Sequence, residues 1–389
     1  MSFLVGALAA VFVFQSCEDS STTTLENYSD SEYEVLSESL NLPRGLYDYT
    51  TDAPTFARPN TVDIFDPNTH KENHKATLGR VLFYDDQLSI NNTVSCASCH
   101  QQQLAFADDA ELSVGFDEQL SLRNSLPLGN TVGFEVAYGG SSFGPRAMFG
   151  WDEANRDIAS QSEAAITSTL EMGMHDLTQL QAKLNKIDYY NILARKAYGE
   201  EKMSRFQILE ALDAFINSIA STNSPFDEGA KGKSMDAMMH QPFSNFTAQQ
   251  NAGKELYMNN CSSCHSVDHS KTAIARANNG LDLVYEDKGV GAVTGQNRDN
   301  GVFKVPFLRN IELTAPYMHD GRFATLDEVL DFYSEGIQNH ENLAMQLRSG
   351  GKAKTFAFSQ EDKDALKAYM LTLTDLSITQ EVKWSDPFE

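Results

Sequence analysis

Two short runs of the sequence combine paired cysteines with an adjacent histidine. Residues 96–100 read CASCH and residues 261–265 read CSSCH, so both follow the pattern C-x-x-C-H. Two thiols at this spacing lie on one turn and can each add to a haem vinyl group, while the adjacent histidine can bind the iron. We therefore expect two covalently attached c-type haems, bound by Cys96, Cys99, His100, Cys261, Cys264 and His265.

Two other uses of a C-x-x-C pair fit the sequence less well. A zinc ribbon needs a second ligand pair at a fixed spacing, which neither motif has. A thioredoxin-like dithiol needs strands alternating with helices around it and gives the histidine no role. The fifth cysteine, Cys17, stands alone, so no structural disulfide is expected unless a C-x-x-C pair closes on itself.

The segments around the motifs have the pattern of helices joined by long irregular loops. Apolar residues recur at helical spacing, as in Ile208, Leu212 and Phe215, and strand-like alternation is sparse. Helices are expected over residues 72–84, 156–170, 177–184, 187–198, 204–219, 248–258, 326–333 and 360–373. The predicted fold is mainly α, with two c-type cytochrome domains that each carry one haem.

The first 45 residues are expected to export and tether the protein. Residues 3–14 are almost wholly apolar but too few to span a bilayer, which takes about 20. They suit a signal peptide, 1–17, that ends in a lipobox at Cys17, although no Lys or Arg precedes them; a plainly cleaved signal or a short anchor is the alternative. Residues 18–45 are acidic and predict a flexible tether, so membrane contact is expected only through the lipid.

The rest of the chain is predicted to form an N-terminal cytochrome domain over residues 46–235 and a C-terminal one over residues 236–389. The turn-rich run 224–233 marks the boundary between them. The formal charge is −24, from 30 basic and 54 acidic residues, which excludes nucleic acid as a partner. A protein partner steered by charge would be neutral or basic on its contact face; acidity that only aids solubility is the alternative.

Longer runs of the sequence are similar to the bacterial di-haem cytochrome c peroxidase family, and to its MauG-like branch in particular. The resemblance covers about residues 75–375. The matching runs are LGRVLFYD at 78–85, SCASCH at 95–100, RNS at 123–125, WD at 151–152, EM at 171–172, FKVPFLRN at 303–310 and LTAPYMHDG at 313–321. The resemblance implies that the N-terminal domain holds a peroxide-reacting haem and the C-terminal domain an electron-transfer haem.

The same resemblance assigns roles to single residues. Glu171 would be the acid–base group over the open face of the haem held by His100, with Gln161 beside it. A carboxyl group there can move a proton between the two peroxide oxygens. Trp151 would relay electrons between the haems. Without the resemblance, Glu171 would be one acid among 54 and Trp151 an ordinary core residue.

The resemblance also implies one calcium ion at the domain interface. Its ligands would be the Asn124 side chain and the backbone oxygens of Thr314 and Pro316. Calcium prefers oxygen ligands of these kinds, although backbone ligands cannot be identified from sequence.

Two positions depart from the peroxidase pattern. The family's peroxidases carry a histidine on the Ser-Val-Gly loop that blocks the first haem, and here that residue is Phe116, which cannot bind iron. The first haem should then stay open, unless His70 or His74 replaces the missing ligand. The methionine that caps the second haem is replaced by Tyr333, and the MauG-like branch has a tyrosine there. Met318 and His319 are the alternatives.

Another position departs from the MauG-like pattern. A surface tryptophan before the second haem motif corresponds to Asn259 here, and the remaining tryptophan, Trp384, lies far away in the sequence. The resemblance therefore does not imply that this chain builds the methylamine dehydrogenase cofactor.

Three functions follow from these observations. The first is reduction of hydrogen peroxide with electrons that a small cytochrome c or cupredoxin delivers through the second haem. The second is a peroxide-driven oxidase that takes electrons from an organic or protein substrate. The third is a tethered electron carrier without catalysis, which would gain nothing from an open haem beside Glu171.

Overall fold

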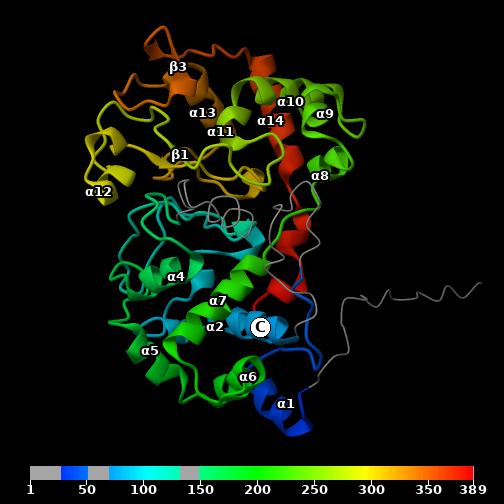
Figure 1. Cartoon of the computed structure of the whole chain (residues 1–389), viewed down its shortest axis with the longest axis vertical. Coiled ribbons are helices and arrows are strands. Elements are labelled where there is room, and N and C mark those ends of the chain that lie inside the picture. The colour runs from blue at the N-terminus through cyan, green and yellow to red at the C-terminus, as the bar shows by residue number, and fades with distance from the viewer. Residues whose placement is uncertain (1–27, 51–69, 132–148, 389) are drawn as a thin grey trace, which may run out of the picture.

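The computed structural model describes residues 28–50, 70–131 and 149–388, which form two mainly helical lobes (Figure 1). The N-terminal lobe contains α1 (Asp30–Ser37), α2 (His70–Tyr84), α4 (Ile158–Thr167), α5 (Leu177–Leu184), α6 (Asp188–Tyr198) and α7 (Arg205–Ser218). The C-terminal lobe contains α8 (Pro225–Ala230), α9 (Met235–His240), α10 (Ala248–Asn260), α11 (Ser262–His265), α12 (Val290–Thr294), α13 (Leu326–Asp331) and α14 (Gln360–Met370). The prediction of a mainly helical fold is confirmed.

Short elements complete the two lobes. The strands β1 (Arg276–Ala277) and β2 (Phe303–Lys304) pair antiparallel, as do β3 (Arg348–Ser349) and β4 (Lys352–Ala353). The 3-10 turns span Asp86–Leu88, Cys96–Ser98, Gln102–Leu104, Asn297–Asp299, Ile311–Leu313, Met345–Leu347, Leu371–Leu373, Leu376–Thr379 and Val382–Trp384. Most of the loop between these pieces is irregular, which leaves room for a prosthetic group in each lobe.

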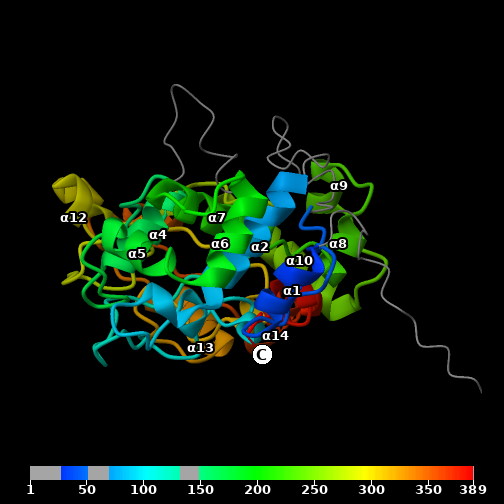
Figure 2. The same ribbon diagram turned by 90° about the horizontal axis from the view of Figure 1, so that it is seen from below.

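Each lobe is built on one pair of closely crossing helices. In the N-terminal lobe α2 packs on α7, and both views show α2, α6 and α7 side by side (Figures 1 and 2). A Cβ on Gly79 of α2 would lie 1.9 Å from the Ala211 carbonyl oxygen, so only glycine permits this approach. In the C-terminal lobe α10 packs on α14 with Gly253 against Ala365 in the same way, at 1.8 Å. The helix that precedes each C-x-x-C-H motif is thus anchored to a later helix of its lobe.

Helix starts in this chain are set by capping residues. The Ser204 hydroxyl accepts from the Gln207 backbone N–H, and the Gln207 side chain accepts from the Ser204 backbone, which forms a capping box. Thr247 and Ser359 begin α10 and α14 in the same way. The predicted helix 177–184 agrees with α5, whereas the predicted helix 326–333 ends at Asp331 and continues as a π-helical turn over Phe332–Gly336.

Residues 28–45 of the acidic segment 18–45, predicted to be a flexible tether, include helix α1 and pack on the N-terminal lobe. Ser29 and Glu32 form a capping box at the start of α1, and Leu36 is fully buried in the core of the N-terminal lobe. Glu32 also pairs with Arg195 and Lys196 of α6. The tether prediction was wrong here because spaced apolar residues anchor an acidic helix. Residues 1–27, including Cys17, lie outside the described part of the chain.

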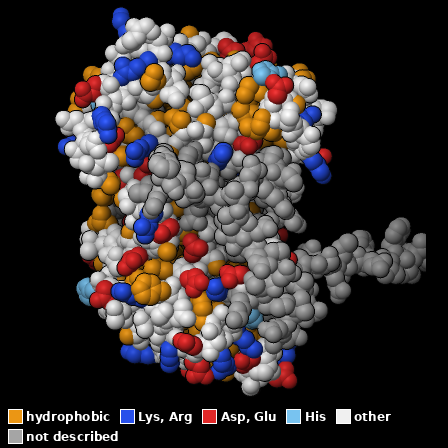
Figure 3. All heavy atoms as spheres, in the orientation of Figure 1, with side chains coloured by type: hydrophobic (Ala, Val, Ile, Leu, Met, Phe, Trp, Pro, Cys, Tyr) orange, Lys and Arg blue, Asp and Glu red, His pale blue; other side chains and the backbone are white. Residues whose placement is uncertain are grey.

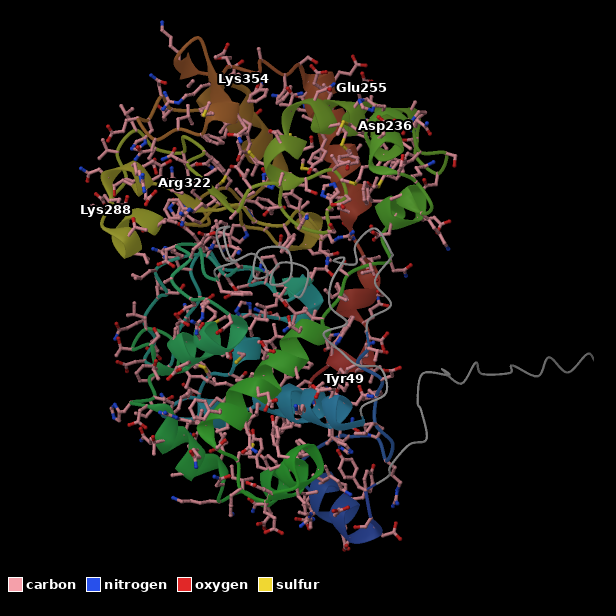
Figure 4. All side chains as sticks on the ribbon, viewed as in Figure 1. Tyr49, Asp236, Glu255, Lys288, Arg322 and Lys354 are labelled. Carbon is pink, nitrogen blue, oxygen red and sulfur yellow. The ribbon has the colours of Figure 1, made fainter. Side chains whose placement is uncertain are left out.

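The structure also departs from the predicted domain boundary at both ends of the second domain. Phe226 and Ala230 of α8 belong to the C-terminal core, so that lobe begins before residue 236. Ile378 and Trp384 instead pack into the N-terminal core, to which the chain returns after α14 (Figure 1). Tyr49, fully buried in the same lobe, lies close to this returning segment (Figure 4). In the described ranges, no helix is both long and apolar enough to cross a membrane.

Candidate active site

The first C-x-x-C-H motif forms a tight turn that presents its cysteines and histidine together. Backbone N–H groups of Cys99 and His100 donate to the Cys96 carbonyl at 3.2 and 3.0 Å. The Ser98 hydroxyl accepts from the Ser95 backbone and closes the turn. The second motif follows α10 directly, and there the N–H groups of Cys264 and His265 donate to the Cys261 carbonyl at 3.1 Å each. Both motifs therefore have the local geometry that haem attachment needs.

Both motif histidines are oriented as iron ligands. The Nδ1 atom of His100 lies 3.1 Å from the Phe106 carbonyl oxygen, and Nδ1 of His265 lies 3.0 Å from the Pro306 carbonyl oxygen. A ligating histidine commonly donates its second ring N–H in this way, which fixes the tautomer and leaves Nε2 for the metal. Burial lowers the pKa of His265 to about 4 and also lowers the pKa of His100, so in both rings burial favours the neutral form that binds iron.

The four cysteines of the two motifs are half-buried and form no disulfide. Burial raises the pKa of Cys96 to about 12 and that of Cys99 to about 11. Burial likewise raises the pKa of Cys261 to about 12. A redox dithiol or a thiolate metal site needs a lowered pKa instead. Within residues 28–50, 70–131 and 149–388, no cluster of His, Cys, Asp and Glu could hold a metal ion by itself. The raised pKa values therefore argue against a redox dithiol and against a thiolate metal site.

A cavity of about 440 Å³ lies beside the first motif, and a smaller one of about 130 Å³ adjoins it. His100, Gln161 and Glu171 line both cavities, and Trp151 lines the larger one. The remaining wall of the smaller cavity is mainly apolar, with Phe83, Val94, Ile158 and Met172 among its residues. The space, its apolar wall and the oriented histidine fit a covalently attached haem.

Glu171 lies on a turn that follows α4 rather than at the end of a longer helix. Helix α4 ends at Thr167, and the Glu171 backbone N–H donates to the Ser168 carbonyl at 3.2 Å. The Glu171 carbonyl accepts from the backbone N–H of Phe116 at 2.8 Å, which joins the turn to the loop 113–121. Burial raises the pKa of the Glu171 carboxyl, against a smaller lowering by the Ser168 hydroxyl. The group can therefore hold a proton at a higher pH than an exposed glutamate.

Gln161 and Trp151 are held by neighbouring backbone and side chains. The Gln161 side-chain oxygen accepts from the Asn155 amide at 2.9 Å. The Trp151 indole N–H donates to the Asn124 carbonyl at 2.8 Å, and its ring meets the His319 ring edge to face at 6.5 Å. The four residues assigned to peroxide chemistry and electron relay thus meet around one cavity.

The larger cavity also reaches the segment that holds the second histidine. Pro306, whose carbonyl orients His265, contributes to the wall that His100 shares. Lys304, two residues earlier, donates its backbone N–H to the Trp151 carbonyl at 2.8 Å. Trp151 therefore lies between the cavity beside the first motif and the segment 304–306, whose Pro306 carbonyl orients His265 of the second motif.

A buried charged group near Trp151 was not predicted from the sequence. Glu153 is only 3% exposed and pairs with Arg276 at 3.0 Å. Lys304 lines the cavity, and burial lowers its pKa to about 7, against the opposite effect of Glu153. Lys304 lies in the matched run FKVPFLRN, but the burial of its amine depends on the packing of both lobes and is not visible in that motif.

Phe116 lies on the loop that adjoins Glu171, and its ring packs against Gly173. A Cβ on Gly173 would meet the Phe116 ring at 2.4 Å. The alternative ligand His74 is buried with its ring against Tyr28 and is not among the cavity residues. The side chain of His70 lies outside the described part. Of the two alternative histidines, His74 therefore lies away from the cavity, and the proposal for His70 stays a prediction.

Tyr333 lies in the π-helical turn next to the second motif. Burial raises its pKa to about 12, against a lowering by its hydrogen bond with Asn279. The same asparagine donates to the Met318 sulfur at 3.7 Å, so the two candidate ligands, Tyr333 and Met318, share one hydrogen-bond partner. His319 is stacked on Phe303 with ring centroids 3.7 Å apart. Its ring is therefore engaged at the lobe interface near Trp151.

The segments assigned to calcium lie side by side. The Asn124 backbone N–H donates to the His319 carbonyl at 2.9 Å, so the segment around Asn124 lies beside the turn that follows Pro316. The Asn124 side-chain amide donates to the carbonyls of Ala110 and Glu111 at 3.2 and 3.3 Å. The peptide bond between Ala315 and Pro316 is cis. Thr314 is partly exposed.

Comparisons with known proteins agree with this arrangement. Residues 73–235 match the family model described as di-haem cytochrome c peroxidase, and residues 250–374 match the model for cytochrome c. The methylamine utilization protein MauG of Methylorubrum extorquens is 30% identical over 77% of this chain and 78% of that protein. The cytochrome c551 peroxidase of Pseudomonas aeruginosa is 29% identical over 72% of this chain and 76% of that protein.

A solved structure has the same architecture. It is described as a MauG-like protein associated with microbial copper homeostasis, and it matches with a TM-score of 0.71 at 28% identity. The match covers 87% of this chain and 99% of that one. These matches confirm the family that the sequence predicted, and membership of this family implies two c-type haems. The chain belongs to the di-haem cytochrome c peroxidase (MauG) family.

Proposed function

We propose that this protein reduces hydrogen peroxide to water at the first haem, with electrons that a small redox protein delivers through the second. The observation that carries the proposal is the cavity in which Glu171 and Gln161 share a wall with His100. An oriented histidine, a protonatable carboxyl and an amide around one space suit peroxide cleavage. A plain electron carrier has no need of them.

The protein's own groups would guide the proton. Haem, when bound, supplies the electrons that break the O–O bond. Glu171 would take a proton from one peroxide oxygen and return it to the other, which leaves as water; such proton transfer contributes about 10²–10⁴-fold in rate. Burial raises the pKa of this carboxyl, so it holds a proton more readily than an exposed glutamate does. The Gln161 amide would position the leaving oxygen by a hydrogen bond.

Electrons would pass between the lobes by way of Trp151. The proposal is supported by the place of Trp151 on the cavity wall and by its backbone link to the β2 segment that runs on to Pro306. At the second haem we propose Tyr333 as the sixth ligand, with Met318 as the competitor. A phenolate ligand favours the more oxidised iron state.

The remaining expectations concern the surroundings of the enzyme. The adjoining segments at Asn124 and His319 support a calcium site that includes the backbone oxygens of Thr314 and Pro316. On the face shown in Figure 3, acidic and basic side chains are interspersed over both lobes, and the net charge of −24 favours a neutral or basic donor protein. Export and lipidation at Cys17 stay predictions from the sequence.

A second candidate function is oxidation of an organic or protein substrate with peroxide. Phe116 and Tyr333 favour it, because both depart from the peroxidase pattern toward the MauG-like branch. The 30% identity to a methylamine utilization protein MauG points the same way. The two functions share the peroxide step and differ in which donor restores the haems.

Peroxide turnover with reduced cytochrome c or cupredoxin tests the proposal. Glu171→Gln keeps the size of the side chain but removes the exchangeable carboxyl proton, so turnover should fall by about 10²–10⁴-fold. Glu163→Gln is the matched control, because Glu163 is an exposed residue of the preceding helix α4 and should leave turnover unchanged. Haem oxidation by peroxide without donor turnover would favour the oxidase function. Equal turnover in the two variants would contradict the role of Glu171.

A further inference from the structure

Two adjacent tyrosines of α6 share one carboxylate at the end of α2. The hydroxyl groups of Tyr189 and Tyr190 both donate to the same oxygen, Oδ2 of Asp85, at 2.7 Å. The two rings lie 4.7 Å apart between centroids. The other carboxylate oxygen, Oδ1, accepts from the Gln87 backbone N–H at 2.8 Å, which fixes Asp85 in place.

The pair leads from the first haem-attachment turn toward the surface. Tyr190 is completely buried in the core cluster of the N-terminal lobe, and Cys96 of the first haem-attachment turn packs against the same cluster. Tyr189 is half-buried, and its ring lies edge to face with Phe388 at 6.3 Å. Phe388 itself is 37% exposed. One tyrosine therefore faces the haem side and the other the solvent side.

The shared carboxylate makes both tyrosines easier to oxidise. Removing an electron from a phenol produces a strong acid, and in an apolar core that proton needs an acceptor within hydrogen-bond distance. Asp85 provides this acceptor for both hydroxyl groups. A role in helix packing alone would explain one such hydrogen bond but gives no reason for two oxidisable rings to share one oxygen.

We propose that Tyr190, Tyr189 and Asp85 form an exit path that carries oxidising equivalents from the peroxide-oxidised first haem to one-electron donors at the protein surface. The inference rests on the proposed reaction with peroxide and adds a second site at which substrates are oxidised. Phenols are the substrate class that fits, because they give up one electron and one proton together, as tyrosine does.

Each transfer along this path moves one electron and one proton. Tyr190 passes one electron to the oxidised haem and its hydroxyl proton to Asp85, which leaves a neutral tyrosyl radical. Tyr189 then gives one electron to Tyr190 and one proton to Asp85, while the first proton returns from Asp85 to Tyr190. A phenol at the surface then gives one electron to Tyr189 and releases its own proton to solvent, while Asp85 returns the proton that it holds to Tyr189, so that Asp85 is ionised again and the phenol becomes a phenoxyl radical. The proton that accompanies the electron at the haem is taken up from solvent. Two such cycles use the two oxidising equivalents of one peroxide.

Freeze-quench electron paramagnetic resonance on the holoprotein with both haems tests this path. After addition of peroxide without a donor, the wild type should give a tyrosyl radical signal. Tyr189→Phe with Tyr190→Phe, and separately Asp85→Asn, should lose it. Tyr33→Phe, whose hydroxyl donates to the Leu42 carbonyl, is the control and should keep it. A ring-fluorinated tyrosine at 190 preserves the hydroxyl and should change the hyperfine pattern, which guards against misfolded variants.

The haem absorbance in the same samples separates the two proposals. If peroxide changes the haem spectrum but the double variant keeps the radical signal, or the wild type forms none, the exit path is wrong and the peroxidase function stands. If peroxide leaves the haem spectrum unchanged, the peroxidase function fails, and the exit path fails with it. Loss of the signal in the variants, together with unchanged haem oxidation and slower phenol oxidation, supports the path.

Discussion

Glu171 combines two properties at the scale of a single residue: it borders the first haem cavity, and burial disfavours its charged form. A folded-state pKa above the unfolded value means that the buried carboxyl favours folding only while it is protonated. This contribution is fully present below the unfolded pKa, which is about 4.3, and is lost as the pH rises through the folded pKa. The ionised Glu171 carboxylate thus lowers the free energy of unfolding in the pH range in which the residue would transfer protons.

Glu171→Gln should therefore stabilise the protein at neutral and alkaline pH. The amide removes the cost of ionisation, so the free energy of unfolding should rise by on the order of 1 kcal/mol near pH 8, and the gain should vanish near pH 4. Denaturant unfolding of the holoprotein at several pH values measures this. Glu163→Gln, an exposed change, should show no such pH dependence. A destabilised Glu171→Gln at pH 8 would mean that the charged form is favoured in the fold.

Residues inside motifs could be identified from sequence, whereas residues defined by burial could not. The spacing of Cys96, Cys99 and His100 by itself predicts haem attachment, because the three residues lie on one local turn. Lys304 and Glu153 become neighbours only when residues about 150 positions apart pack together, so their charges looked like ordinary surface charges. Sequence patterns carry no information on such desolvation.

At the scale of elements, the loop 113–121 positions the turn that carries Glu171. A Cβ on Gly115 would lie 1.9 Å from the Leu170 carbonyl oxygen, and the next residue donates its N–H to the Glu171 carbonyl. The loop and the turn are thus in direct backbone contact. Any group larger than hydrogen at position 115 must push the Glu171 turn away from its place.

Gly115→Ala should lower peroxide turnover with little change in haem content. A shift of the Glu171 turn by about 1 Å can reduce the rate by on the order of 10²-fold, because proton transfer requires close alignment. Steady-state turnover with a reduced cytochrome measures this effect. Gly129→Ala is the control, since its added Cβ would meet only the tip of the Ile378 side chain at 3.2 Å. Unchanged turnover in Gly115→Ala would show that the loop does not position the carboxyl group.

Helices with clear apolar spacing were predictable, and their ends less so. All the residues that form the apolar face of α5 lie within Leu177–Leu184, and the helix predicted over residues 177–184 has these same bounds. The predicted helix 156–170 instead ends at Thr167, where the chain enters a turn whose Glu171 carbonyl accepts from the Phe116 N–H of the loop 113–121. The π-helical turn at Tyr333 likewise continues directly from the end of α13, and the helical spacing of the local sequence does not predict it.

At the scale of the whole molecule, the end of the chain ties the two lobes together. After α14 the chain returns to the N-terminal lobe, where the Tyr84 hydroxyl donates to the Trp384 carbonyl at 2.6 Å. The Trp384 indole donates to the Ser218 hydroxyl, and Arg80 donates to the Ser385 carbonyl at 2.6 Å. Arg123 adds an ion pair from the first lobe to Asp287 of the second at 2.7 Å. These contacts therefore hold the two lobes, and the C-x-x-C-H motif in each of them, in a fixed relative position.

Trp384→Ala should destabilise the N-terminal lobe strongly. Trp384 is 5% exposed, and removal of a buried tryptophan side chain costs about 3–5 kcal/mol. Denaturant unfolding monitored at the first haem measures the loss. Phe388→Ala, at a position 37% exposed, should cost much less. If both variants lose less than about 1 kcal/mol, the returning segment does not contribute to the core. The packing of the returning segment on the N-terminal lobe was not predictable from the sequence, because contacts such as Tyr84 to Trp384 join residues about 300 positions apart.

The account depends most on a first haem whose distal side is open next to Glu171. Magnetic resonance and optical spectra of the fully oxidised, resting holoprotein test this directly. The account predicts one high-spin iron, at the haem of His100, that binds an added small ligand such as cyanide, together with one low-spin iron at the second site. Two low-spin irons, both closed to the added ligand in every redox state, would contradict it.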